Sequence, residues 1–385
     1  MKILLFHYDE LDELGGVETL VRSMSCAFTE LGHPTGVLEL GRQWLPRREL
    51  MPGVPIWRIT GSTFPCLRRP GSWLSFGRSI GQFLRVVNDF DPDVVHVHFP
   101  VHQSLTIVGA CRLPHRWKLA VTVHNSDIRG EPQKDPRIRL WRDRLFARAD
   151  AVTAVSDSLL AEARKAYPAI ADKGTVIYNG ISAEWGTANS HPGNLQERKY
   201  VLYAGRLHAV KGVDTLLSAW SRLSDAIADV TLLIVGDGPE RKNLEARAVE
   251  LGITASVTFL PTQSKPALAA LYRRAECVVL PSQREGLAMA LLEAGACGAI
   301  CVASNVTGIY EVIEDGVNGL LFPYGDVAAL SKALATALRM PDEERQSLRL
   351  AAQQRVAEHF TEERMLRNYL DLYSGLMHQA GRKVV

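Results

Sequence analysis

The chain has little of several features that assign a protein class at once. No apolar run reaches the roughly 18 residues that a membrane-spanning helix needs, and residues 1–6 meet His7 and Asp9 too early to form the apolar core of a secretory signal. The six cysteines include no CxxC pair and have no pair of histidines nearby, which argues against a zinc site. We expect buried thiols in a reducing, cytoplasmic compartment.

Net charge is nearly absent as well. The 44 Lys and Arg residues stand against 42 Asp and Glu residues, a net charge of +2, so the whole protein has no attraction to nucleic acid and no nucleic-acid partner is expected. The composition, with 46% hydrophobic and 22% charged residues, excludes a disordered or collagen-like chain. A length of 385 residues is sufficient for about two domains.

Two nucleotide-binding signatures are missing. The sequence contains neither GxGxxG nor GxxxxGK[ST], so a nicotinamide-binding Rossmann site and a P-loop lose most of their support. Instead, short apolar strands alternate with segments of helical spacing in two successive halves, separated by the polar linker 183–198. This pattern predicts two α/β domains with doubly wound parallel sheets and a ligand in a cleft between them. The expected strands are 3–6, 93–98, 119–124, 151–155, 175–178, 201–204, 231–235, 256–260, 276–280 and 300–303, and the last three helices lie near 325–339, 341–358 and 361–379.

Positive charge is concentrated in residues 41–90. This segment contains eight arginines and two acidic residues, which gives a local charge of +6, and aromatic residues are interleaved with the arginines. The arginines are Arg42, Arg47, Arg48, Arg58, Arg68, Arg69, Arg78 and Arg85. Three interpretations stand: a solvated surface, a contact of residues 42–85 with the anionic headgroups of a membrane surface, or the binding of an anionic acceptor.

Several loops have the composition of anion-binding sites. Gly15 and Gly16 precede a helix, whose free N–H groups and dipole favour phosphate, although a plain tight turn is the alternative. Arg206 and Lys211 flank the turn 205–212 after the first strand of the second half. Two cations at such a turn can clamp a diphosphate, and the alternative for each is a solvated surface side chain.

The segment 285–293 carries two carboxylates, Glu285 and Glu293, after a predicted strand. A helix beginning near Leu287 would set them roughly 12 Å apart along its axis and would leave the N–H groups of residues 287–289 free for a phosphate. Carboxylates accept hydrogen bonds from sugar hydroxyls, and a Glu293 buried in an apolar helix needs a partner. The alternatives are a helix cap for Glu285 and a satisfied interior acid for Glu293.

The same segment, EGLAMALLE, resembles the E-x7-E motif of retaining GT-B glycosyltransferases of the family 4 type. Other segments match that family in its order, and the resemblance runs from about residue 3 to 330. These segments are GGVE at 15–18, DVVHVH at 93–98, AVS at 154–156, IYNG at 177–180, GRL with KG at 205–212 and VGDGP at 235–239.

The resemblance implies a GT-B fold with two facing Rossmann-like domains. Residues 1–183 would form the acceptor-side domain and residues 184–360 the domain that binds the nucleotide-sugar donor, while residues 361–385 would form a helix that packs back on the first domain. The reaction implied is a retaining, metal-independent hexosyl transfer to an acceptor hydroxyl, with no cofactor. The acceptor would be a glycan, a glycolipid or a lipid-linked sugar in bacterial surface polysaccharide, lipopolysaccharide or glycolipid synthesis, with the enzyme cytoplasmic or peripheral on the inner face of the membrane.

Site residues follow from the resemblance in the same way. Arg206 and Lys211 would neutralise the diphosphate, Glu293 would accept hydrogen bonds from the ribose, Glu285 would accept them from the transferred sugar, and His124 would lie near the reacting centre. The expected catalytic residues are therefore His124, Arg206, Lys211 and Glu285. The expected donor-binding residues are Arg206, Lys211 and Glu285 together with Gly15, Gly16, Gly236, Gly286, Leu287, Ala288, Met289 and Glu293.

Three departures from the family pattern affect the expected specificity. Asn125 follows His124 where the family often has Asp, Ala288 stands where it has Gly or Pro, and Pro261 replaces a Gly beside the expected nucleobase pocket. The acceptor and the base therefore stay open.

Alternative sites and functions remain. His96 and His98, with His102 and His124, suggest a metal site, but no carboxylate or cysteine ligands that would complete it are evident. Residues 91–93 (Asp-Pro-Asp) suggest either a metal-binding DxD motif or a surface turn. Among functions, a GT-B sugar-nucleotide epimerase, a glycosyl phosphorylase and a non-catalytic carbohydrate-binding protein of the same fold are the alternatives.

Overall fold

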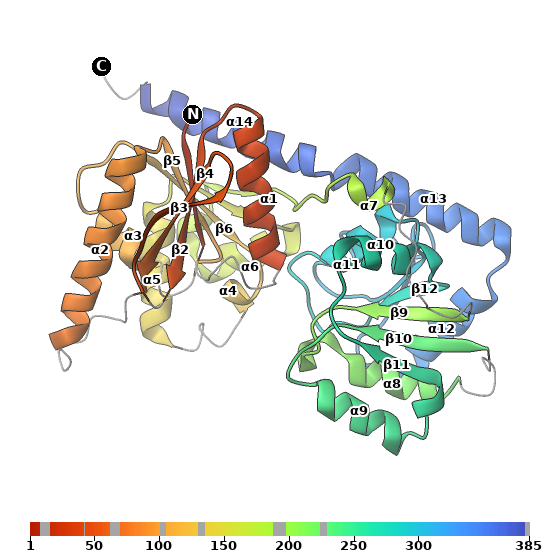
Figure 1. The fold of residues 1–385 in the computed structure, drawn as a ribbon. Helices are drawn as coiled ribbons and strands as arrows, with labels where there is room; N and C mark the ends of the chain where they lie inside the picture. The colour runs from red at the N-terminus through yellow and green to blue at the C-terminus, as the bar shows by residue number, and fades with distance from the viewer. Residues whose placement is uncertain are drawn as a thin grey trace. The chain divides into compact units, whose positions relative to one another are not determined.

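The computed structural model describes residues 1–7, 16–41, 43–61, 70–100, 105–129, 135–187, 198–223 and 229–381. The chain packs as two compact units (Figure 1). Unit 1 comprises Met1–Tyr178 and Met365–Val385, and unit 2 comprises Asn179–Arg364. The domain limits predicted at 183 and 360 fall a few residues from these bounds. Gly15, Arg42, Arg68, Arg69 and His102 lie outside the described residues.

Unit 1 is built on an eight-stranded sheet. Its order is β3-β4-β2-β1-β5-β6-β7-β8, and every neighbouring pair is parallel except β3 with β4. An uninterrupted apolar run such as Ile3-Leu4-Leu5-Phe6 suits a central strand covered on both faces. The strands are β1 (Ile3–His7), β2 (Thr35–Gly41), β3 (Leu45–Met51), β4 (Val54–Thr60), β5 (Val94–His98), β6 (Lys118–Val123), β7 (Ala151–Ala154) and β8 (Gly174–Val176).

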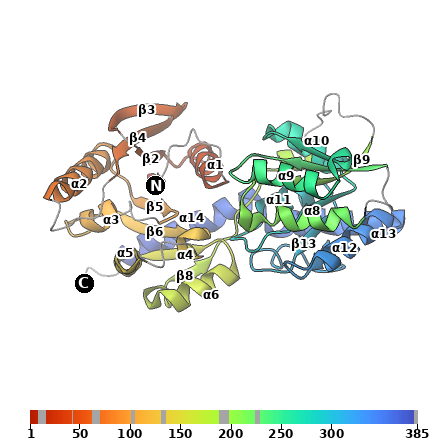
Figure 2. The ribbon, with the colours of Figure 1, turned by 90° about the horizontal axis from the view of Figure 1, so that it is seen from below.

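Helices cover both faces of this sheet. On one face, α1 (Gly16–Glu30) and α14 (Glu362–Gly381) share a core with β1, to which Phe28, Tyr369 and Tyr373 contribute. On the other face lies α2 (Pro70–Phe90), whose Phe83 packs edge-on against Trp117, and Figure 2 shows α1 and α2 on opposite sides of the strands. The remaining helices are α3 (Leu105–Ala110), α4 (Ser126–Arg129), α5 (Pro136–Arg148), α6 (Asp157–Ala166) and the 3-10 turn η3 (Pro168–Ile170).

Unit 2 contains a six-stranded sheet in which all neighbouring strands are parallel, in the order β11-β10-β9-β12-β13-β14. Figure 1 shows α8 and α9 on one side of its strands and α10 and α11 on the other. The strands are β9 (Lys199–Ala204), β10 (Val230–Val235), β11 (Val257–Leu260), β12 (Cys277–Leu280), β13 (Cys301–Ser304) and β14 (Leu320–Phe322). The helices are α7 (Glu184–Thr187), η4 (Ala209–Lys211), α8 (Val213–Ser221), α9 (Arg241–Glu250), η6 (Thr254–Ser256), α10 (Lys265–Arg274), α11 (Met289–Ala296), α12 (Val327–Arg339) and α13 (Asp342–His359).

The prediction of two doubly wound parallel sheets is confirmed, and each expected strand is present. Four strands were not predicted: β2, β3, β4 and β14. β2 carries the charged residue Glu39 within its buried run, β3 is largely exposed, and β14 has three residues, so these three lack the uninterrupted buried apolar run of β1. β4 is largely buried, but Pro55 and Arg58 stand among its apolar residues.

Candidate functional site

The predicted donor-binding residues of unit 2 follow the carboxyl ends of β9, β10 and β12. Arg206 and Lys211 follow β9, Gly236 follows β10, and Glu285 follows β12. These strands are parallel neighbours, so their carboxyl ends meet along one edge of the sheet. Open parallel sheets bind ligands at this edge, and the side chains of these loops are therefore placed to act together.

Backbone crowding fixes the course of these loops. Gly236 has a φ of +139°, and a Cβ on it would lie 2.0 Å from the carbonyl oxygen of Gly205. Gly212 has a φ of +68°, and a Cβ there would lie 2.1 Å from the carbonyl oxygen of Pro281. Only glycine has both the conformational freedom and the missing side chain that these contacts require.

Lys211 and Glu285 are brought into direct contact. The ammonium Nζ of Lys211 donates to Oε1 of Glu285 over 2.7 Å, and the Glu285 side chain is only 9% exposed. Gln283 N–H donates to the carbonyl of Val210 at 2.8 Å, which ties the same two loops together through the backbone. Arg206, in contrast, is exposed and forms no ion pair with the described residues. One predicted cation is thus paired with a predicted carboxylate, and the other faces solvent.

The helix predicted to begin near Leu287 is present but begins two residues later. Helix α11 begins at Met289, and Ala288 has φ −78° and ψ 79°, which is not helical. The N–H of Ala288 donates to the carbonyl of Gly308 at 3.1 Å and that of Met289 to Leu287 at 2.9 Å, so these two groups are not free for a phosphate as predicted. The helical spacing assumed between Glu285 and Glu293 therefore does not apply, because residues 285–288 form an irregular segment.

The loop after β13, which sequence reasoning missed, supports that segment. Thr307 accepts a hydrogen bond from the Glu285 N–H at 3.2 Å. Gly308, with a φ of +78°, would bring a Cβ to 2.5 Å from the carbonyl oxygen of Glu285. The residue Gly308 is the one sequence signal that could have drawn attention to this loop. The close approach of this loop fixes the backbone of Glu285 and therefore the position of its carboxylate.

Glu293 lies on α11 and has the partner that its burial led us to expect. The phenol of Tyr272, on α10, donates to Oε2 of Glu293 at 3.2 Å. Burial raises the pKa of Glu293 to about 7, because the charged carboxylate loses hydration, while the hydrogen bond from Tyr272 acts in the opposite direction. Near neutral pH this carboxyl group can therefore be protonated or ionised.

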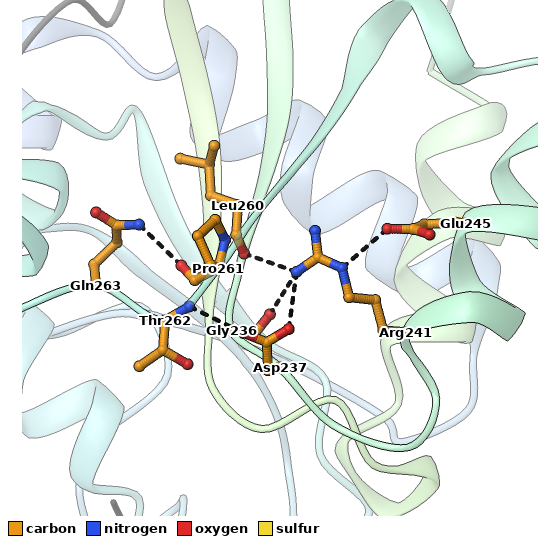
Figure 3. A network of polar contacts seen from close by, with 8 residues as sticks. All are labelled: Gly236, Asp237, Arg241, Glu245, Leu260, Pro261, Thr262 and Gln263. Atoms are coloured by element: carbon orange, nitrogen blue, oxygen red, sulfur yellow. Dashed lines mark hydrogen bonds and ion pairs between the residues drawn. The ribbon is translucent and has the colours of Figure 1, made fainter.

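Arg241 ties the ends of β10 and β11 together, as Figure 3 shows, and was also missed. Its Nη1 donates to the carbonyl of Gly236 at 3.1 Å and to that of Leu260 at 3.2 Å, and it pairs with Asp237 at 3.1 Å. The chain continues from Leu260 into Pro261, the departure noted above. Arg241 thereby fixes the backbone on which the expected base-side loop begins.

In unit 1, His124 follows β6 and is buried. His98 Nδ1 and His124 Nε2 share a hydrogen bond of 3.2 Å, in which one of the two nitrogens is the donor. The carboxylate of Asp127 accepts hydrogen bonds from the N–H groups of His124, at 2.9 Å, and of Asn125, at 2.7 Å. Burial, with a smaller contribution from the nearby His7, lowers the pKa of His124 to about 3, so the imidazole is neutral at physiological pH. This environment makes His124 a neutral hydrogen-bonding group rather than a cation.

The histidines considered as a metal cluster form hydrogen bonds instead. His96 uses Nδ1 with the Tyr373 hydroxyl at 2.5 Å and Nε2 with the Thr122 hydroxyl at 2.6 Å. Across the part of the chain that the structure describes, no group of three or more potential ligands is arranged to hold a metal ion. The 91–93 turn lies at the amino end of β5, where the Asp93 carboxylate accepts a hydrogen bond from the N–H of Lys2 at 2.7 Å.

Part of the positive charge of residues 41–90 is neutralised from outside that segment. The buried Glu39 of β2 pairs with Arg48 at 2.8 Å and with Arg58 at 2.7 Å. Exposed side chains of this segment lie on β3 and on α2, where Trp73 is 51% and Leu74 is 78% exposed. Among the described residues, no helix has both the length and the apolar character to span a membrane.

Comparison with known proteins gives matches for both halves of the chain. Residues 14–185 match the family model described as "Glycosyltransferase Family 4", and residues 188–355 match the one described as "Glycosyl transferases group 1". Gly16 and His124 fall in the first match, and Arg206, Lys211, Glu285 and Glu293 fall in the second.

Individual relatives share about a quarter of their residues with the chain. It is 28% identical over 359 residues to a D-inositol 3-phosphate glycosyltransferase of Salinispora tropica, covering 85% of this chain and 74% of the relative. It is 26% identical over 372 residues to an N-acetyl-alpha-D-glucosaminyl L-malate synthase of Bacillus anthracis, covering 94% of each. Both relatives are thus matched over most of their length.

Solved structures share the fold at lower identity. A sucrose-phosphate synthase from Thermosynechococcus elongatus has a TM-score of 0.81 at 22% identity, covering 98% of this chain and 99% of the other. The Anabaena protein HepE, solved in complex with UDP and glucose, has a TM-score of 0.80 at 20% identity, covering 97% of this chain and all of the other.

Proposed function

Since the chain belongs to the family 4 glycosyltransferases of GT-B fold, we propose that it transfers a sugar from a nucleotide-diphosphate sugar to an acceptor hydroxyl. The observation that carries the proposal is the Lys211–Glu285 pair at the carboxyl edge of the unit 2 sheet, beside the exposed Arg206. A single 2.7 Å contact thus holds together a cation that can bind the diphosphate and a carboxylate that can accept hydrogen bonds from sugar hydroxyls. HepE, a structural neighbour, was solved with UDP and glucose, which supports a donor of this class.

The proposed reaction retains the configuration of the transferred sugar and uses no metal ion. Arg206 and Lys211 provide two positive charges for a leaving diphosphate, Glu285 orients the sugar, and Glu293 binds the ribose. The acceptor hydroxyl attacks from the face that the nucleotide leaves, and the departing phosphate takes up its proton. Catalysis in this scheme depends on positioning and on charge stabilisation at the leaving group, with the neutral His124 as a hydrogen-bonding group of unit 1.

A thermal-shift panel tests the donor class. We expect the matching nucleoside diphosphate and its sugar conjugate, at about 100 times their Kd, to raise Tm by about 5 °C or more, because ligand binding of that strength adds about 2.7 kcal/mol. Comparison of the anomeric configuration of donor and product by NMR then tests retention. Stabilisation by free sugars, with none by any nucleotide or nucleotide sugar, would instead favour a non-catalytic carbohydrate-binding protein.

For the acceptor, we propose a membrane-associated glycan, glycolipid or lipid-linked sugar of the bacterial surface, reached by a cytoplasmic protein that binds the inner face of the membrane. The support is the exposed side of α2, which presents Trp73 and Leu74 together with the exposed Arg78 and Arg85. Aromatic and apolar groups enter the interface while arginines contact anionic headgroups, each basic residue contributing about 1 kcal/mol.

Vesicle binding tests this surface. We expect the Trp73→Ala/Leu74→Ala double variant to bind vesicles of anionic phospholipid about tenfold more weakly or worse, because two apolar side chains no longer leave water on binding. Sedimentation with vesicles measures the affinity. Leu350→Ala, which removes a leucine 57% exposed on α13 of unit 2, is the matched control and should change nothing. Unchanged binding by the double variant, or no binding by the wild-type protein, would remove the membrane proposal.

A further inference from the structure

The carboxylate of Glu293 is held from one side. Its Oε2 accepts the hydrogen bond from Tyr272, and Oε1 has no hydrogen-bond partner among the described residues. The two groups come from neighbouring helices, α10 and α11, and their residues lie 21 positions apart in the sequence. Fixing one oxygen of a carboxylate fixes its plane, so the direction in which Oε1 offers its lone pairs is also determined.

Tyr272 is itself rigidly placed. It is fully buried, and its ring packs 6.0 Å from that of Trp185, centroid to centroid. The carbonyl of Trp185 accepts hydrogen bonds from the Cys297 thiol, at 3.1 Å, and from the guanidinium of Arg273. Burial raises the pKa of Tyr272 well above its ordinary value, so the phenol keeps its proton and donates it to the carboxylate.

We propose that Tyr272 is a positioning residue that holds Glu293 as an ionised acceptor for the ribose hydroxyls of a nucleoside diphosphate, so that binding of the nucleotide releases a proton to solvent. The nature of the ligand rests on the proposed function, whereas the role of Tyr272 rests on the contact between the two side chains. The proton balance is simple: the carboxylic acid loses its proton to water, and the resulting carboxylate accepts hydrogen bonds from Tyr272 and from the ribose.

Glu293 is the group in this cluster whose titration falls near neutral pH. The charged and titratable groups around it are Lys265, Arg273 and Tyr272 on α10, Cys297 just after α11, and Cys301 on β13. Burial raises the pKa of Cys297 to about 11 and that of Cys301 to about 12, so these thiols stay neutral. From α13, Ala352 and Val356 approach Gly295 of α11, and Gln353 approaches Gly298, just after α11. None of these three side chains titrates.

The direction of the pH dependence follows from the pKa of about 7 in the unliganded protein. Hydroxyl donors favour the ionised carboxylate, so affinity should be highest above pH 7 and fall by up to tenfold per pH unit below it. The Tyr272 hydroxyl also favours the ionised form. Its removal raises the pKa of Glu293, and the loss of affinity should then begin at a higher pH.

Calorimetry on the full-length chain tests this linkage. UDP, GDP and ADP are titrated between pH 5.5 and 8.5 in buffers of different ionisation enthalpy, which counts the protons released. For the nucleotide that binds, we expect partial proton release at pH 7 and loss of release above pH 8. Tyr272→Phe should weaken binding about fivefold at pH 7 and much less at pH 8.5, because about 1 kcal/mol of hydrogen bonding is lost. The 2′-deoxy and 3′-deoxy forms of the same nucleotide should bind the wild-type protein more weakly.

Two further variants separate positioning from general destabilisation. Tyr200→Phe is the matched control: its buried hydroxyl donates to the carbonyl of Leu271 at 2.8 Å, next to Tyr272 in the chain, and it should leave the pH profile unchanged. Glu293→Gln removes the titrating carboxyl group, so only the proton release of the diphosphate itself, whose last ionisation lies at about pH 6, should remain, even if Tyr272→Phe fails to fold. It should also shrink the difference between the ribose and deoxyribose nucleotides.

The outcomes are distinguishable. If the wild-type protein binds a nucleotide with no proton release and a flat pH profile, or if Tyr272→Phe and Tyr200→Phe behave alike, the role of Tyr272 is overturned and the proposed function stands. If none of the nucleotides binds at any pH, both the proposed donor and the ligand assigned to Glu293 are overturned. Proton release that depends on Glu293 and a profile that shifts only in Tyr272→Phe support the inference.

Discussion

Replacing Lys211 by alanine is expected to lower kcat/KM for the matched nucleotide sugar by about 30- to 150-fold, which corresponds to about 2–3 kcal/mol of transition-state stabilisation. Lys211 lies where charge would develop on the leaving diphosphate, and its ammonium also holds Glu285 at 2.7 Å. The variant thus loses a cation and also the ammonium group that holds the buried Glu285 carboxylate. Steady-state kinetics with varied donor concentration measures both kcat and KM.

The matched control is Lys199→Ala. Lys199 belongs to the same unit, but its side chain is 69% exposed and it lies 3.9 Å from Glu276, at the amino end of β9. Exposed pairs of this kind contribute about 0–1 kcal/mol, so activity should be close to that of the wild-type protein. Full turnover by Lys211→Ala would contradict the assignment of Lys211 to diphosphate binding. An equal loss in both variants would mean that the effect comes from the overall charge.

Gly236→Ala is expected to destabilise unit 2 by about 3 kcal/mol or more. The added Cβ would lie 2.0 Å from the carbonyl oxygen of Gly205, in a backbone conformation with a φ of +139° that other residues rarely adopt. The loop that carries Arg206 must move to relieve this contact, so nucleotide affinity should fall as well. Urea unfolding followed by circular dichroism measures the stability.

A second glycine separates backbone strain from crowding. Gly252 has a φ of +68°, yet a Cβ on it would meet nothing within 4 Å. Gly252→Ala should therefore cost only about 1–2 kcal/mol, the penalty of the left-handed conformation, and leave nucleotide binding intact. If the two variants lose the same stability, the close approach of Gly236 to Gly205 has no energetic consequence.

The parts of the fold that the sequence predicts are those where burial alone decides the structure. β1, β5 and β6 are buried strands rich in Val, Leu and Ile and covered on both faces, and their alternation with helices indicates the parallel sheets. Strand β2 was not predicted, because the charged residue Glu39 interrupts its apolar residues. That residue is tolerated inside because Arg48 and Arg58 reach it from β3 and β4, a pairing that only the folded chain creates.

The site shows the same division. Motif spacing selects Lys211, Glu285 and Glu293, and burial predicts that Glu293 has a partner. The identity of Tyr272 as that partner does not follow from spacing, because the contact joins two helices. The N–H of Ala288 was predicted to be free, but it donates to the carbonyl of Gly308, in the loop after β13. Local sequence does not reveal such competition for backbone hydrogen bonds.

The path of α14 has a consequence for biosynthesis. Its first residues belong to unit 2, while Tyr369 and Tyr373, deep in the unit 1 core, bond to side chains of β5 and β6. A ribosome synthesises these tyrosines after the whole of unit 2, so the unit whose synthesis begins first stays incomplete until unit 2 has been made. Unit 2 is one continuous stretch of chain, Asn179–Arg364, and holds all of its own strands before α14 has emerged. Unit 2 can therefore complete its sheet before unit 1 can complete its core, although the synthesis of unit 1 begins first.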